Sequence, residues 1–207
     1  MAYDDILEQA EVYYSSRFAA HGATPAGVDW NSAESQELRF VQLAKITDGR
    51  RAFSILDYGC GYGALREWLA QDDRDFDYLG FDLSSEMVEH ARETSRRARF
   101  STDVSELAAQ DFTVASGIFN VKLDVDSRRW QQYVIDVIRS LDSLSRLGFA
   151  FNMLTAHSDP DRMRDDLYYG DPVFYFEHCI RNYARNVALL HDYGLYEFTI
   201  LVRKDVA

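Results

Sequence analysis

The chain has 207 residues, a length that fits one domain, and its 47% hydrophobic content is that of an ordinary globular protein. A net charge of −12 argues against nucleic acid as a partner, because such binding depends on phosphate neutralisation by Lys and Arg. Two cysteines are too few for a disulfide framework, and no segment has the roughly 18 apolar residues of a membrane span. We therefore expect a cytoplasmic protein, a monomer or homodimer, that binds no membrane.

The first fifty residues predict two helices joined by a loop. Apolar residues recur at near-helical spacing over residues 3–20 and again over 32–48. The segment between them, HGATPAGVDWN, is rich in Gly and Pro and predicts the loop. Within a single domain of residues 1–207, we expect residues 1–50 to form a helical lid on a core formed by residues 51–207.

From residue 51 onwards, strand and helix patterns alternate. Apolar runs predict strands at 53–59, 77–82, 98–103, 111–119 and 147–154. Amphipathic runs predict helices at 64–71, at 84–97 with Ser84 or Ser85 as N-cap, and at 128–145. A loop over 155–173 and a helix over 174–184 lead to a hairpin of two strands over 186–204, turning around Asp192–Gly194. This order predicts an α/β fold with a mostly parallel sheet, helices on both faces and one antiparallel strand.

The most specific motif is a glycine-rich turn between the first of these strands and its helix, Asp57-Tyr58-Gly59-Cys60-Gly61-Tyr62-Gly63. Glycines let the backbone turn tightly and approach a ligand closely. An acid, Asp82, ends the next strand about 20 residues further on, where a carboxylate can accept hydrogen bonds from both ribose hydroxyls of a nucleotide. Strand, turn, helix, strand and acid thus follow one another in the order of a nucleotide site.

These stretches resemble the successive motifs of class I S-adenosylmethionine (SAM)-dependent methyltransferases, which are matched by ILDYGCGYGAL, GFDLSSEMVEHAR, VASGIFN and the terminal LYEFTILVRK. The resemblance covers residues 53–204. It implies a Rossmann-like three-layer sandwich with seven strands, the last one antiparallel, and SAM as cofactor with S-adenosylhomocysteine (SAH) as product. The segment HGATPAGVDWNSAESQELRF resembles a narrower bacterial group of small-molecule methyltransferases and adds nothing on the substrate.

The same resemblance implies which residues surround SAM. In this class the acid and the glycines of the turn surround the methionine portion, the next acid holds the ribose, apolar residues flank the adenine, and an acid after the third strand binds its exocyclic amine. In this order the matching residues are Asp57, Gly59, Gly61, Gly63, Asp82, Leu83, Met87, Asp103 and Val104.

Position in the sheet selects the remaining candidates, because ligands of open α/β sheets bind outside the carboxyl ends of the strands. Gly117 follows the fourth strand and is expected beside SAM, whose carboxylate is expected to meet Tyr14 or Arg17 of the lid. Each of the other candidates has a plainer alternative, a solvated histidine, a turn asparagine or a packing aromatic residue. The candidate general bases are His157, His191 and His21, and the candidate substrate-binding residues are Trp30, Asn120, Asn152 and Tyr193.

The glycine turn also satisfies the pattern of NAD-binding proteins, as Gly59-x-Gly61-x-x-Ala64. Against this interpretation, the carboxylate of Asp57 would repel a pyrophosphate, and no Tyr is followed four residues later by Lys, the pair that short-chain dehydrogenases use. An NAD-dependent oxidoreductase and a non-catalytic SAM-binding regulatory or partner module stay open as alternatives.

The residues after the fourth strand, SGIFN, narrow the expected reaction. They lack the Asn/Asp-Pro-Pro-Tyr/Phe pattern of enzymes that methylate nucleobase or glutamine amines. They also lack the metal-binding aspartate of catechol methyltransferases. We expect metal-independent transfer of a methyl group, by in-line displacement, to an O or N atom of a small-molecule metabolite.

Overall fold

Seven strands form one sheet in the computed structural model, which describes residues 3–205. Their order is β3-β2-β1-β4-β5-β7-β6, and β7 is antiparallel to both of its neighbours while the other pairs are parallel. The strands are β1 (Ala52–Tyr58), β2 (Asp75–Phe81), β3 (Arg99–Ser101), β4 (Gln110–Ala115), β5 (Ser145–Leu154), β6 (Asn186–Leu190) and β7 (Glu197–Arg203). Chain order reverses between β1 and β4, which opens a crevice at the carboxyl ends of these two strands.

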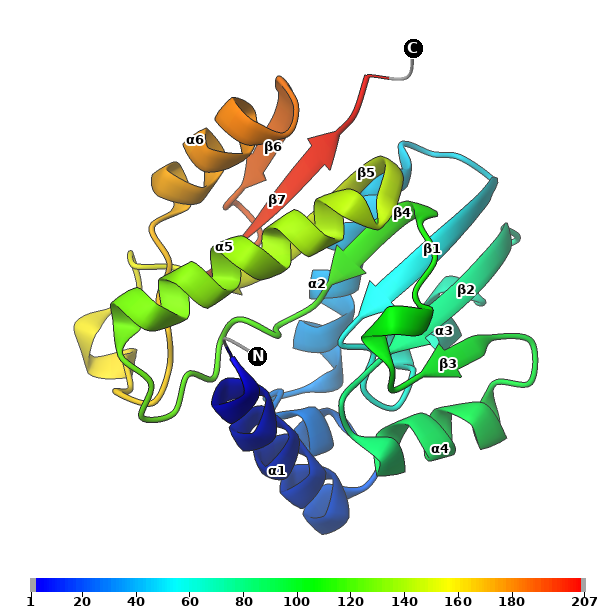
Figure 1. Ribbon diagram of the computed structural model, residues 1–207, viewed down its shortest axis with the longest axis horizontal. Helices are drawn as coiled ribbons and strands as arrows, with labels where there is room; N and C mark the ends of the chain where they lie inside the picture. The colour runs from blue at the N-terminus through cyan, green and yellow to red at the C-terminus, as the bar shows by residue number, and fades with distance from the viewer. Residues whose placement is uncertain (1–2, 206–207) are drawn as a thin grey trace.

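Helices cover both faces of the sheet, so the predicted Rossmann-like three-layer sandwich is confirmed (Figure 1). They are α1 (Asp4–His21), α2 (Ala33–Ala44), α3 (Ala64–Leu69), α4 (Ser85–Thr94), α5 (Ser127–Ser143) and α6 (Pro172–Asn182). No helix within residues 3–205 combines the length and the apolar character needed to cross a lipid bilayer.

Alternation along the central strand β5 divides the core into two layers. Phe149 and Phe151 pack with α5 and α6 on one face, whereas Ala150 between them packs with α2, α3 and α4 on the other. Successive side chains of a strand point to opposite faces, so a continuously apolar strand can serve two cores. This explains why the run over residues 147–154 carries no polar alternation.

Side chains fix where the helices begin. The Ser84 hydroxyl accepts a hydrogen bond from the backbone N–H of Met87 at 3.4 Å, and so caps α4. Asp126 caps α5 by accepting from the N–H of Arg128 at 3.0 Å, and Asp171 caps α6 by accepting from that of Val173 at 2.8 Å. Of the two serines predicted as the cap of α4, the structure selects Ser84, because Ser85 is already helical.

Several of the predicted elements are shorter than expected, two of them for a clear local reason. The strand predicted over 111–119 was wrong beyond Ala115, because Gly117 has a φ of 75°, which an extended strand does not have. Its apolar Phe119 is buried in the core from a turn instead. The helix predicted over 32–48 ends at Ala44 and continues as a single 3-10 turn, Lys45–Thr47.

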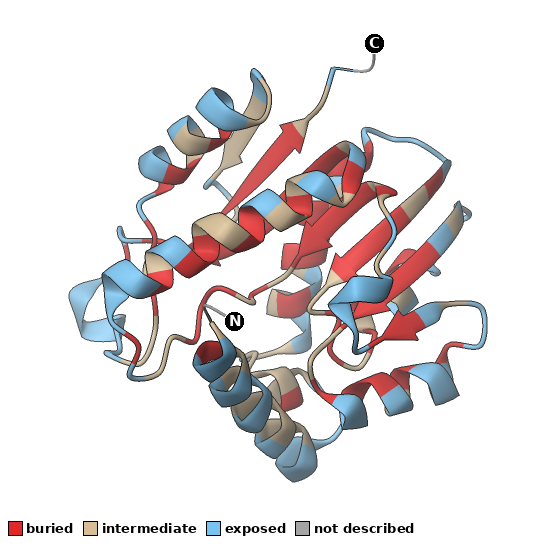
Figure 2. Cartoon of the chain, in the orientation of Figure 1, coloured by how far each residue is buried: buried red, intermediate tan, exposed pale blue. Residues whose placement is uncertain are grey.

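Helix α1 lies across the carboxyl ends of the strands (Figure 1). Only one of its described side chains, Ile6, is buried (Figure 2). Polar contacts hold both of its ends: the Tyr3 hydroxyl donates to Asp136 of α5 at 2.6 Å, and the Ser15 hydroxyl donates to Ser84 at the start of α4 at 2.9 Å. The helix therefore spans from one layer of helices to the other.

The packing of α5 gives a test of the core. Ile138 is fully buried in the cluster that α5 forms with β5 and β7, whereas Ile135 on the same helix is only half-buried. We expect Ile138→Ala to lower the free energy of unfolding by about 2–5 kcal/mol, because it leaves a cavity in a packed core. Ile135→Ala should cost less than half as much. Urea unfolding of the two variants checks this, and equal losses would contradict the assigned packing.

Candidate functional site

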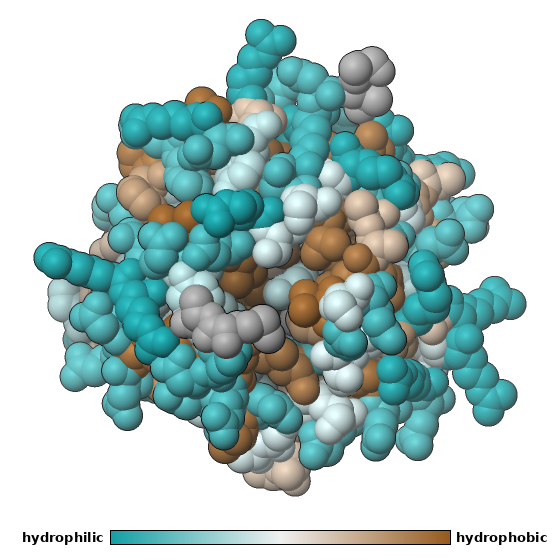
Figure 3. Space-filling view, in the orientation of Figure 1, coloured by the Kyte–Doolittle hydropathy of each residue, from teal (hydrophilic) through white to brown (hydrophobic). Residues whose placement is uncertain are grey.

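A cavity of about 350 Å³ lies at the carboxyl edge of the sheet, beneath α1. The turn after β1, the ends of β2 and β3, the turn after β4, α1 and α2 all contribute to its wall. On the surface, apolar side chains gather around a hollow in the middle of this face (Figure 3). The lining includes Leu7, Glu11, Tyr14, Val28, Trp30, Gln36, Asp57, Gly59, Gly61, Asp82, Leu83, Met87, Asp103, Val104, Gly117, Ile118 and Tyr133.

Backbone rather than side chains forms the wall at the turn after β1. Gly59 and Gly61 have φ values of 84° and 54°, in the region that favours glycine. A Cβ atom at Gly59 would lie 2.2 Å from the side chain of Ile118, and one at Gly61 would lie 3.1 Å from that of Val28. The N–H of Gly59 donates to the carbonyl of Phe81 at 2.7 Å, which fixes the turn against the end of β2.

Asp82 lies directly after β2 with both carboxylate oxygens held by backbone amides. One oxygen accepts from the N–H of Gly61 at 2.7 Å and the other from the N–H of Ser84 at 3.0 Å. Burial raises the pKa of this carboxyl above its ordinary value, and the amide hydrogen bonds oppose that rise. A carboxylate has about four acceptor positions, so two hydroxyl groups of a ligand can still donate to Asp82.

Asp57, the last acid of β1, is only 2% exposed. Its Oδ2 accepts a hydrogen bond from the Tyr78 hydroxyl at 2.6 Å, while its Oδ1 has no partner among the described residues. Burial, together with the nearby charge of Asp82, raises the pKa of Asp57 to about 7 although the Tyr78 hydrogen bond lowers it. An unpaired buried carboxylate oxygen at a cavity wall is suited to a cationic hydrogen-bond donor.

The charges around this cavity have one sign. Its described lining contains the carboxylates Glu11, Asp57, Asp82 and Asp103 and has no Lys, Arg or His. Such a surface attracts cationic groups and repels a pyrophosphate, which is the ligand part that an NAD site must bind. Within residues 3–205, no three His, Cys, Asp or Glu side chains group in a way that could hold a metal ion.

A second cavity, of about 420 Å³, adjoins the first. The two share four lining residues, Tyr14, Val28, Trp30 and Gly117, which form the wall between them. A Cβ atom at Gly117 would lie 2.2 Å from the Trp30 indole, so only glycine allows this close contact. The second cavity is more polar, and its further lining includes Asp29, Asn31, Arg39, Asn120, Leu154, Arg162, Arg164, Tyr169, Tyr196 and Glu197.

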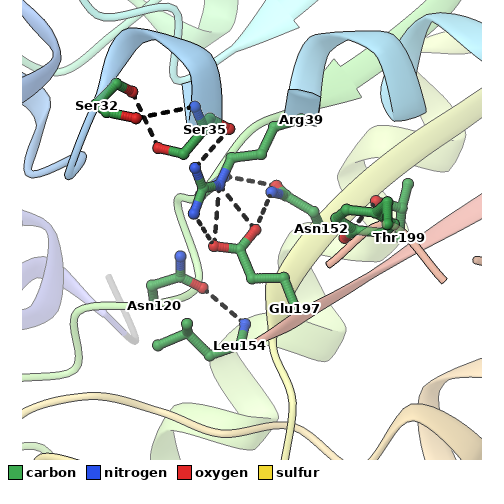
Figure 4. Close-up of polar contacts among 10 residues, drawn as sticks. Ser32, Ser35, Arg39, Asn120, Asn152, Leu154, Glu197 and Thr199 are labelled. Carbon is green, nitrogen blue, oxygen red and sulfur yellow. Dashed lines mark hydrogen bonds and ion pairs between the residues drawn. The ribbon is translucent and has the colours of Figure 1, made fainter. Parts of the chain in front are cut away.

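A closed series of contacts supports the wall, and Figure 4 shows its polar part, in which Arg39, Glu197 and Asn152 point toward one another. The guanidinium of Arg39 lies 3.9 Å from the Trp30 ring and donates through Nε to both carboxylate oxygens of Glu197 at 2.9 Å. The amide of Asn152 donates to Glu197 at 2.7 Å and accepts from the N–H of Gly117 at 2.8 Å. Since Gly117 in turn contacts Trp30, these five residues form a ring that joins α2, β5, β7 and the turn after β4.

Most of the residues expected around SAM line the first cavity, but two do not. Gly63 has a φ of 87° and faces Ala91 and Phe100, so it packs α3 against α4 and β3. Arg17 pairs with Asp29 at 2.9 Å instead of reaching the cavity. Tyr14, the alternative to Arg17, lines both cavities.

The candidate bases and substrate residues divide in a similar way. Trp30 and Asn120 line the second cavity. Asn152 belongs to the ring of contacts, and the Tyr193 hydroxyl pairs with Thr199 at 3.0 Å, so neither lines a cavity. None of the three histidines lines either of these two cavities: the rings of His157 and His191 lie tilted to each other with their centroids 6.0 Å apart, and His21 is exposed at the end of α1.

Two residues of the ring of contacts, Arg39 and Glu197, are not among those predicted from the sequence. A signal for Arg39 was present, because α2 buries Gln36, Phe40 and Leu43, and a residue at 39 falls on that same face. A charged residue on the buried face of a helix calls for a buried partner. Nothing local indicates that the partner is Glu197, 158 residues away.

The buried ion pair gives a second test. Arg39 is 6% exposed and Glu197 1%, so Glu197→Gln would leave a buried guanidinium without its counter-charge. We expect a loss of about 3–5 kcal/mol in the free energy of unfolding. The double variant Arg39→Met/Glu197→Gln should recover a large part of it, because it buries no unpaired charge. Thermal and urea unfolding check both, and a double variant no more stable than the single one would contradict this account.

Known proteins with related sequences and structures include methyltransferases. The family model of a methyltransferase domain matches residues 55–142. Rv1506c of Mycobacterium tuberculosis, a protein classed as a methyltransferase, is 49% identical over 165 residues, which cover 77% of this chain and 98% of that protein.

Solved structures share the fold. Magnesium protoporphyrin IX methyltransferase from Synechocystis PCC 6803, crystallised with SAH, superposes with a TM-score of 0.61 at 16% identity, over 83% of this chain and 84% of that one. The PH0226 protein of Pyrococcus horikoshii OT3 superposes with the same TM-score at 14% identity, over 90% of this chain and 99% of that one. Together with the glycine turn and the acid-lined cavity, these similarities establish that the chain belongs to the class I SAM-dependent methyltransferases.

Proposed function

We propose that this chain binds SAM in the first cavity and methylates an O or N atom of a small-molecule metabolite held in the second. The observation that carries the proposal is the common wall of the two cavities, formed by Tyr14, Val28, Trp30 and Gly117. These shared residues mark where the two cavities adjoin, so a donor in one cavity and an acceptor in the other come nearest to each other there. In-line transfer requires the acceptor atom to reach the methyl carbon directly, and this border is where the two can meet.

The residues of the first cavity fit SAM group by group. The unpaired oxygen of Asp57 is suited to the ammonium group, and Asp82 to the ribose hydroxyls. We assign Leu83 and Met87 to the faces of the adenine and Asp103 to its exocyclic amine.

The SAM carboxylate needs neutral donors, because no cation lines this cavity in the described chain. Tyr14 offers a hydroxyl. Gln36, 7% exposed, accepts from the Tyr62 hydroxyl at 3.2 Å through its Oε1, which leaves its amide N–H groups for the ligand. We assign the carboxylate to these two residues.

When bound, SAM would supply the methyl group, and sulfur would keep the electron pair of the bond that breaks. The acceptor atom would form the new bond to the methyl carbon and lose its proton to water. The protein's own contribution is alignment, which can supply about 7–11 kcal/mol of the barrier reduction. Trp30 and Gly117 set the distance between the two sites, and α1 covers the cofactor cavity against water. We assign no histidine as general base, because none lines either cavity in the described chain. We assign no metal ion to the reaction, because Ser116–Asn120 carry no acid.

Cofactor binding is tested by titrating SAH into the intact protein and following the heat. We expect Asp82→Ala to weaken SAH binding by about 1–3 kcal/mol, the scale of hydrogen bonds to a charged group. Asp77→Ala, on the exposed side of the same strand, is the matched control and should bind normally. Absence of binding by the unaltered protein at millimolar SAH would refute the proposal, and an unchanged affinity of Asp82→Ala would refute the ribose assignment.

The pH dependence of binding tests the role of Asp57. Its raised pKa of about 7 means that the carboxyl is mostly neutral at lower pH and becomes anionic as the pH rises. The ammonium group of SAM stays protonated up to about pH 7, so only the protein side changes. We expect SAM affinity to rise about tenfold from roughly pH 5.5 to roughly pH 7, from the increase in ionised carboxyl. In Asp57→Asn this rise should disappear; an equally steep rise in that variant would assign it to another group.

A further inference from the structure

The acids of the second cavity already have partners. Glu197 is engaged by Arg39 and by the amide of Asn152. Asp29 pairs with Arg17 at 2.9 Å and accepts from the Tyr13 hydroxyl at 2.8 Å. Neither carboxylate therefore needs a cation from a ligand.

Asn120 presents an unused donor to this cavity. Asn120 is only 6% exposed, and its Oδ1 accepts a hydrogen bond from the N–H of Leu154 at 3.1 Å (Figure 4). That bond fixes which end of the amide is oxygen and which is nitrogen. No acceptor for the Nδ2 is present among residues 3–205, although the residue lines the cavity. The Nδ2 is not among the fully buried side-chain atoms that lack a partner, so it is open to the cavity and can donate to a ligand oxygen there.

Two arginines add donors to the same lining. Arg164 pairs with Asp166 through Nε and Nη2, and its Nη1 is left over. The backbone of Arg164 is held by a hydrogen bond from its N–H to the Tyr169 hydroxyl at 2.9 Å. Arg162 has only a distant partner, Asp161 at 3.9 Å. In a chain with a net charge of −12, this cavity thus offers more donors and cations than free acceptors.

From this imbalance we infer that the methyl acceptor is an oxyanion, a small molecule that carries a carboxylate or a phosphate. The inference rests on the proposed function, and it adds the class of the substrate. The anionic group pairs with Arg164 and Arg162, and a further oxygen of the substrate accepts from Asn120. These contacts direct the atom to be methylated towards Trp30 and Gly117, where the two cavities meet.

The binding of matched small molecules to the SAH-loaded protein tests the inference. Benzoate, phenyl phosphate and the neutral benzamide share one ring and differ in the group that the arginines would meet. Saturation-transfer NMR should show binding of at least one of the two anions at low millimolar concentration and at least tenfold weaker binding of benzamide. The anion that binds more tightly identifies carboxylate or phosphate. Equal binding of all three, or no binding of either anion, would overturn the inference.

Variants locate the contact. Arg164→Gln should weaken binding of the preferred anion about tenfold, the scale of a hydrogen bond to a charged group. Asn120→Asp, which keeps an acceptor for the N–H of Leu154 but loses the Nδ2 donor, should weaken it at least as much. Arg181→Gln is the matched control, because Arg181 is also an exposed arginine paired with a carboxylate, Glu177, and lies on α6 outside both cavities.

Three readouts keep the outcomes separate. Thermal unfolding of each variant shows whether it folds. If Asn120→Asp does not fold, Arg164→Gln, at an exposed position, is by itself a sufficient test. If Arg164→Gln binds SAH normally and its anion binding is also unchanged, the oxyanion inference is overturned while the proposed cofactor site stands. Failure of SAH to bind the unaltered protein would instead overturn the proposed function.

Discussion

The ion pair between Arg39 and Glu197 is the interaction on which the architecture of the site depends. Both side chains are almost completely buried, so neither charge can keep its hydration and each requires the other. The pair fixes α2 to the start of β7, and through Asn152 and Trp30 it reaches Gly117 after β4. Four elements that are distant in the chain thereby meet at the wall between the cavities. The methyl transfer that we propose depends on the geometry where the two cavities adjoin, because a small change in the distance between donor and acceptor costs rate.

The two cavities differ in electrical character, and the difference matches the chemistry assigned to them. The first has only carboxylates among its charged lining residues, which suits the sulfonium, the ammonium and the aromatic amine of the SAM that we propose it binds. The second has its acids paired and its donors free, which is suited to oxygen-rich molecules. A cationic donor and an anionic acceptor attract each other across the wall, most strongly when α1 excludes water and lowers the local dielectric.

Helix α1 covers the first cavity but is held only weakly to the rest of the protein. It has one buried side chain, Ile6, and is otherwise held by part-buried or exposed polar contacts, in which Tyr3 meets Asp136, Ser15 meets Ser84, and Tyr13 and Arg17 meet Asp29. Such contacts add little to stability, so the helix can separate from the sheet more easily than α5, which buries six side chains. The SAM site that we propose beneath α1 needs this property, because the cofactor has to enter and its product has to leave at each turnover.

The sequence by itself determined the order of the elements, the sheet and the edge at which the first cavity lies, because each rests on local signals: the period of apolar residues, the glycines at 59 and 61, and the acid after β2. Only the tertiary structure decided the wall and the second cavity. The Arg39–Glu197 pair spans 158 residues, Asn152 turns out to support Gly117, and His157 and His191 lie away from both cavities. The physical reason is that a buried polar side chain is defined by the partner that satisfies it, and spacing along the chain does not identify partners that folding alone brings together.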